Sequence, residues 1–212
     1  MTGGSYLGEG RGTARPHDRG EALTEQPDPA QDSADPVLGR RRRTGLLLSI
    51  AAVVLVADIV SKLLVVARIA PGENVRVLGG LIYLTELRNV GAAFSFAEGA
   101  TVLFSLVAVA VALVIVRTAR RLYSTGWAVT LGLVLGGALG NLIDRIFRDP
   151  GFLRGGVVDF LSVFGPGGEH FPVFNLADSA ITCGGLLAAF LALRGIEFDG
   201  TRSKGEATAD AA

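Results

Sequence analysis

The sequence predicts an all-α membrane protein, built as a bundle of four transmembrane helices with a small extracytoplasmic β-hairpin and a disordered N-terminal tail. Half of the 212 residues are hydrophobic, and the mean hydropathy is positive. Because roughly 20 apolar residues cross a bilayer as a helix, long apolar runs are the primary signal. Four segments approach that length: 44–66, 100–116, 127–143 and 174–193.

The distribution of Lys and Arg predicts the orientation of these spans. Ten basic residues lie in the N-terminal flank, in the ten-residue link RTARRLYSTG between the second and third spans, and in the C-terminal flank. Six lie in the two opposite loops, 67–99 and 144–173. Basic residues in short loops favour the cytoplasmic side. We therefore expect both termini in the cytoplasm and both long loops on the outer side of the membrane.

The two ends of the chain differ in composition from the membrane domain, 44–195. Residues 1–43 are rich in Gly, Pro and Asp and are too polar to form a core, which predicts a disordered cytoplasmic tail. Residues 196–212 form a shorter cytoplasmic tail. The run Arg40–Arg43 lies beside a long apolar segment, so it indicates a cytoplasmic flank rather than a nucleic-acid site.

The outer loops contain two recognisable patterns and no metal-ligand cluster. The stretch NVRVLGGLIYLTEL has two β-rich runs around Gly79–Gly80, which predicts a hairpin on the membrane surface. The segment FGPGGEHFP is rich in turn residues, and its His170 has no second ligand nearby. The single cysteine, Cys183, excludes an internal disulfide, and we expect it to be a buried, inert thiol. No cofactor or metal is predicted.

Three of the spans carry polar residues at the spacing i, i+3, i+4, which places each set on one helix face. Given the predicted directions of the spans, all three sets converge near the outer leaflet. Glycines at four-residue spacing in the third span, 132, 136 and 140, should let its neighbours approach closely. The sets are Asp58/Ser61/Lys62, Asn141/Asp144/Arg145 and Asn175/Asp178/Ser179.

Structural roles are the simpler interpretation for some of these groups. Asp58–Lys62 and Asp144–Arg145 can form ion pairs that hold the bundle together, and the Asn residues can bond between helices. Asp159 and Asp178 differ, because neither has a basic residue within four positions. An acid without a partner at a membrane boundary is a candidate functional group.

Two facing carboxylates suggest aspartic proteolysis, because such a pair shares one proton and can act as general base and acid. Other peptidase chemistries fit less well. The chain has no His-Glu-x-x-His signature, and Ser61 and Lys62 point about 100° apart on a helix. Two alternatives from other classes remain: a purely structural scaffold, and a small proton-coupled transporter module with Asp58, Asp144 and Asp178 as a relay.

Five blocks of the sequence resemble the lipoprotein signal peptidase (signal peptidase II, prolipoprotein signal peptidase) family over residues 44–195. They are DIVSK, RNVGAAFS, GGALGNLIDR, VVDF and FNLADSAI. The resemblance implies an aspartic endopeptidase of the bacterial cytoplasmic (inner) membrane. Such an enzyme removes signal peptides from diacylglyceryl-modified prolipoproteins, cleaving just before the lipidated cysteine. It also implies that the predicted hairpin is a surface β-cradle.

The same resemblance assigns roles to residues. It implies that Asp159 and Asp178 are the catalytic pair. Membrane lipids and prolipoproteins are then the partners, with no metal and no nucleic acid. The residues implied to support catalysis or bind substrate are Asp58, Lys62, Asn89, Gly91, Asn141, Asp144, Arg145 and Asn175.

Overall fold

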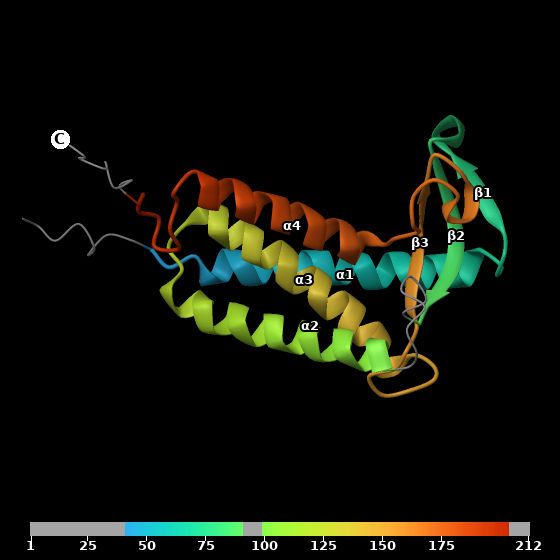
Figure 1. Ribbon diagram of the computed structural model, residues 1–212, viewed down its shortest axis with the longest axis horizontal. Helices are drawn as coiled ribbons and strands as arrows, with labels where there is room; N and C mark the ends of the chain where they lie inside the picture. The colour runs from blue at the N-terminus through green and yellow to red at the C-terminus, as the bar shows by residue number, and fades with distance from the viewer. Residues whose placement is uncertain (1–40, 91–98, 204–212) are drawn as a thin grey trace, which may run out of the picture. The chain divides into compact units, whose positions relative to one another are not determined.

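Four long helices dominate the protein, as seen in a computed structural model that describes residues 41–90 and 99–203 (Figure 1). Each is long and apolar enough to cross a membrane, as predicted for the four apolar segments. The third extends past the predicted end because its last turns carry polar residues that are buried inside the protein. The helices are α1 (Thr44–Arg68), α2 (Gly99–Thr118), α3 (Thr125–Phe147) and α4 (Leu176–Leu193).

Helix α3 is the centre of the bundle and contacts each of the other three helices. Half of its most apolar 18-residue window is buried in the protein, against 17–22% for the others, whose outer faces are therefore left for lipid. Its glycines explain the close packing: a methyl group on Gly136 would lie 2.7 Å from the carbonyl oxygen of Ala51, and one on Gly140 would lie 2.5 Å from a carboxylate oxygen of Asp58. The predicted close approach is confirmed.

A three-stranded antiparallel sheet in the order β1-β2-β3 lies at one end of the bundle (Figure 1). Strands β1 (Asn74–Val77) and β2 (Ile82–Asn89) form the predicted hairpin, whose turn contains Gly79 and Gly80 at positive φ. Strand β3 (Val157–Val163) was not predicted. Its sequence, VVDFLSV, is nearly all buried and lacks the alternation of a half-exposed strand. Phe160 of β3 packs with Val65 and Ile69 at the end of α1.

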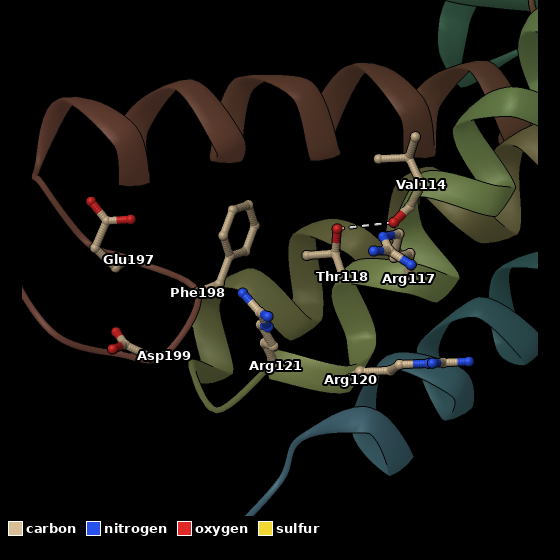
Figure 2. Close-up of a pocket in the computed structure, with 8 residues that line it drawn as sticks. All are labelled: Val114, Arg117, Thr118, Arg120, Arg121, Glu197, Phe198 and Asp199. Carbon is tan, nitrogen blue, oxygen red and sulfur yellow. Dashed lines mark hydrogen bonds between the residues drawn. The ribbon is translucent and has the colours of Figure 1, made fainter.

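The chain after α4 folds back at the end of the bundle opposite the sheet. The carbonyl oxygen of Phe198 accepts hydrogen bonds from the backbone amides of Tyr123 and Ser124, at 2.9 and 3.0 Å. The indole of Trp127 donates to the carbonyl oxygen of Ile196 at 2.6 Å. Residues 195–203 therefore form an ordered segment beside the link between α2 and α3, close to a pocket drawn in Figure 2.

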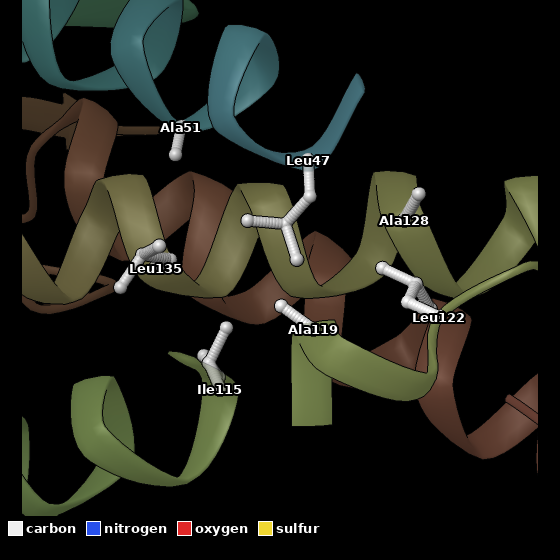
Figure 3. Close-up of a cluster of buried hydrophobic side chains, with 7 residues drawn as sticks. All are labelled: Leu47, Ala51, Ile115, Ala119, Leu122, Ala128 and Leu135. Carbon is white, nitrogen blue, oxygen red and sulfur yellow. The ribbon is translucent and has the colours of Figure 1, made fainter. Parts of the chain in front are cut away.

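The main hydrophobic cluster lies toward this same end and joins α1, α2 and α3 (Figure 3). Leu47 of α1 and Leu122 of the α2–α3 link are almost fully buried in it.

Cys183 is not part of the described hydrophobic clusters. It is exposed on α4, so the prediction of a buried thiol was wrong. The composition of an apolar helix does not show whether a given side chain faces lipid or protein.

Candidate active site

The two acids singled out from the sequence lie where the sheet meets the start of α4. Asp159 is in β3 and Asp178 is in the first turn of α4. Asn175, the N-cap residue of α4, contacts both. Its side-chain amide donates to Asp159 Oδ1 at 2.7 Å, and its backbone amide donates to Asp178 Oδ2 at 3.1 Å. One residue therefore fixes both carboxylates.

The reciprocal bond at Asn175 completes a capping box. The backbone amide of Asp178 donates to Asn175 Oδ1 at 2.9 Å, so the two side chains satisfy one another's exposed backbone donors. This arrangement explains why α4 begins at Leu176, two residues after the start of the predicted span. Phe174 instead pairs with Leu161 in a β-bridge.

Asp159 is 2% exposed and accepts hydrogen bonds from two amides. Besides Asn175, the side chain of Asn89 at the end of β2 donates to Asp159 Oδ2 at 2.9 Å. Burial, with a smaller contribution from the neighbouring charge of Asp178, raises the pKa of Asp159 to about 6, against the lowering effect of the two amides. Asp159 therefore binds a proton more readily than a solvent-exposed aspartate does.

Asp178 is oriented by a second amide from the centre of the bundle. Asn141 of α3 donates to Asp178 Oδ1 at 2.8 Å. The oxygen of the same Asn141 side chain accepts from Lys62 Nζ at 3.0 Å and from Asn175 Nδ2 at 3.2 Å. The polar residues of α1, α3 and α4 thus form one connected hydrogen-bond network, so the predicted convergence of the three polar sets is confirmed.

Lys62 is buried beneath this network and pairs with two acids. Its ammonium lies 2.7 Å from Asp58 Oδ2 and 2.9 Å from Asp144 Oδ2. Asp58 also accepts a hydrogen bond from the backbone of Ala177 at 3.0 Å, and Asp144 from that of Val158 at 3.2 Å. The ion pairs therefore hold the start of α4 and the start of β3 against the helices, one residue away from each candidate catalytic acid.

The prediction that Asp144 forms an ion pair with Arg145 was wrong. Asp144 pairs with Lys62 and with Arg148, which lies four positions on and hence on the same helix face. Adjacent residues point about 100° apart, and Arg145 lies on another side of α3. Its guanidinium stacks over Phe104, 5.6 Å from the ring centroid, and interacts electrostatically most strongly with Asp159 and then Asp178.

The structure thus brings together all but one of the predicted site residues. Gly91, with the rest of GAAFS, lies outside the described residues. Sequence reasoning missed Arg148 as a partner of Asp144, although the i, i+4 spacing was a usable signal. It also missed the backbone amides of Val158 and Ala177, because a backbone donor cannot be recognised from the type of its side chain.

Comparisons with known proteins agree over most of the chain. The family model of signal peptidase (SPase) II matches residues 50–194. The lipoprotein signal peptidase of Streptomyces coelicolor is 49% identical over 164 residues, which are 77% of this chain and 78% of that protein. The lipoprotein signal peptidase of Rhodococcus jostii is 50% identical over 182 residues, covering 86% and 89%. A solved bacterial membrane enzyme superimposes with a TM-score of 0.62 at 31% identity, covering 71% of this chain and 94% of that one.

The fold is that of a multi-pass membrane protein with a network of acids and amides at one end of the bundle. The chain belongs to the signal peptidase II family and is a peptidase that removes signal peptides from prolipoproteins. This membership overturns the alternative of a proton-coupled transporter.

Proposed function

We propose that the protein is an aspartic endopeptidase in which Asp159 and Asp178 are the catalytic pair. One observation carries this proposal: both carboxylates are bonded to the single residue Asn175, at 2.7 and 3.1 Å. Burial raises the pKa of Asp159 to about 6, and the nearby charge of Asp178 contributes to the rise. A pair that shares a proton in this way can supply an acid and a base at once.

The surroundings of the two acids support different roles for them, one as general acid and one as general base. Asp159, with its raised pKa, holds the proton and donates it to the carbonyl oxygen of the scissile bond. Asp178 accepts a proton from a water molecule whose oxygen attacks the carbonyl carbon. When the tetrahedral intermediate collapses, the C–N bond breaks, the leaving amine takes the proton from Asp178, and one hydroxyl of the intermediate returns its proton to Asp159. Asn89, Asn141 and Asn175 hold the two carboxyl groups in place.

The position of the pair supports a substrate anchored in the membrane. The acids lie at the sheet end of the four long helices (Figure 1). The distribution of basic residues favours the outer leaflet for this end, with both termini in the cytoplasm. A signal peptide is itself an apolar helix that ends at this depth. We propose that the scissile bond lies just before a diacylglyceryl-modified cysteine, whose acyl chains stay in the bilayer while the bond reaches Asp159 and Asp178.

The direct test replaces each acid by its amide, which keeps size and removes the ionisable group. Asp159→Asn and Asp178→Asn should each lower turnover of a lipidated prolipoprotein peptide by about 10³-fold, in the middle of the range that a general acid or base contributes. Glu169→Gln, an exposed carboxylate in the same outer segment, is the matched control and should retain full activity. Wild-type turnover by either Asn variant would refute the assignment, as would loss of wild-type activity in EDTA and its return with zinc.

A further inference from the structure

A pocket of about 670 Å³ lies at the end of the bundle opposite the candidate active site. One wall is the last turn of α2 and the short helix η3 (Ala119–Arg121), which together supply three arginines. The other wall is the segment after α4. The lining residues are Val114, Arg117, Thr118, Arg120, Arg121, Glu197, Phe198 and Asp199.

The arginines of this pocket are not equivalent. Figure 2 shows the side chain of Arg121 directed toward the segment that carries Phe198, and that of Arg117 beside Thr118. The side chain of Arg120 extends away from that segment. The hydroxyl of Thr118 donates to the carbonyl oxygen of Val114 at 2.9 Å. Arg117 and Arg121 are therefore the cations placed to meet a ligand inside the pocket.

The opposite wall is held in place before any ligand binds. The ring of Phe198 lies 4.3 Å from that of Trp127, and its carbonyl oxygen is bonded to two backbone amides of the α2–α3 link. Asp199 accepts hydrogen bonds from the backbone and hydroxyl of Thr201, at 2.8 and 2.6 Å, which closes the turn. This wall follows residue 194, where the match to the family ends.

We propose that this pocket binds the phosphate of an anionic phospholipid, with Arg117 and Arg121 on the phosphate. Guanidinium groups bind phosphate oxygens through paired hydrogen bonds, and basic pockets between helices at a membrane boundary bind anionic headgroups. The pocket opens at the ends of spanning helices, and the exposed side chain of Val114 provides an apolar surface on which an acyl chain can lie. Glu197 faces the same space and should weaken the binding of an anion.

The experiment incorporates the full chain into nanodiscs that contain equal amounts of phosphatidylglycerol and phosphatidylcholine, and counts retained lipids by native mass spectrometry. Wild-type protein should retain phosphatidylglycerol preferentially. The double variant Arg117→Gln/Arg121→Gln should lower this preference by roughly fivefold per arginine, whereas Glu197→Gln should increase it. The matched control is Arg41→Gln/Arg42→Gln, which removes equal charge at the same end of the bundle, where Arg43 bonds to the α2–α3 link.

Each outcome decides for or against the site. Equal losses from the pocket and control variants would mean that net charge rather than the pocket selects lipid, and would overturn the proposal. So would an unchanged preference in the pocket variant. If inorganic phosphate stabilises detergent-solubilised protein as well as phosphatidylglycerol does, the ligand is free phosphate and the lipid assignment fails. None of these residues touches the catalytic acids, so cleavage of a peptide in detergent should be unchanged in every variant.

Discussion

The side-chain amide of Asn175 lies 2.7 Å from Asp159 Oδ1, while the same residue caps the helix that carries Asp178. Asn175 therefore both holds Asp159 and caps α4, and two substitutions distinguish these roles. Serine is a good N-cap but is too short to reach Asp159, whereas alanine provides neither contact. We expect Asn175→Ser and Asn175→Ala to lose activity alike, by about 100-fold through misplacement of the acids.

Stability should distinguish these two variants. The serine variant should be more stable than the alanine variant by about 1 kcal/mol, the usual contribution of a cap. Thermal unfolding in detergent measures this difference, and turnover of a lipidated peptide measures activity. If the serine variant kept wild-type activity, the Asn175–Asp159 bond would not contribute to catalysis.

The hydrogen bond from Asn89 to Asp159 predicts a shift in the pH profile. The pKa of Asp159 is about 6, raised from 3.8 mainly by burial, and the amide of Asn89 opposes this rise. Because the proposed mechanism requires the protonated form of Asp159, kcat/KM should fall as the pH rises above about 6. Asn89→Ala removes a lowering influence and should move this limb to higher pH. Asn89→Asp should move it further, because a like charge disfavours ionisation.

The raised pKa of Asp159 also predicts that the free energy of unfolding depends on pH. Folded Asp159 binds its proton more tightly than the unfolded chain does, so its contribution is most favourable below about pH 4 and declines as the pH rises to about 6. Asp159→Asn should remove this decline, as measured by thermal unfolding across that range.

The pH profile of kcat/KM has its own contradicting outcome. An alkaline limb that stays in place in both Asn89 variants would show that another group controls the rate.

The buried ion pairs of Lys62 predict a structural role for Asp144. Asp144→Ala leaves Arg148 and the backbone amide of Val158 without this partner, and leaves Lys62 with Asp58 as its remaining acidic partner. Removing one member of a buried pair costs about 3–5 kcal/mol, so expression and melting temperature should fall together with activity. Arg148→Gln, which removes a partly exposed partner, should cost only about 1 kcal/mol. A fully stable but inactive Asp144→Ala would make Asp144 a catalytic acid.

Much of this arrangement could be predicted from the sequence, because membrane helices leave strong signals. Apolar length gave the four spans, and the spacing of Asp58, Lys62, Asn141 and Asp178 gave their shared faces. Strand β3 could not be predicted, because a short apolar run bounded by glycines has no distinctive period. The pairing of Arg145 was also predicted wrongly. Adjacency in sequence favoured Asp144, whereas helical geometry puts Arg145 on another side of α3, where its charge interacts most strongly with Asp159.

Lipid-dependent cleavage is the sharpest prediction for the proposed substrate. Two acyl chains anchor a peptide at about 0.8 kcal/mol per buried CH₂, and they also fix the depth of the scissile bond against Asp159 and Asp178. Correct positioning of reacting groups is worth several orders of magnitude in rate. We therefore expect a prolipoprotein peptide with a diacylglyceryl cysteine to be cleaved at least about 100-fold faster than the same peptide without the lipid.

The measurement uses purified protein in bilayers, with both peptides at the same surface concentration, so that a difference in partitioning does not imitate a difference in recognition. A peptide that carries one acyl chain on the cysteine is the matched intermediate and should fall between the two. Asp178→Asn serves as the blank for each substrate. Equal turnover of the lipidated and unlipidated peptides would reject lipid-dependent recognition and leave a general membrane peptidase that uses the same pair of acids.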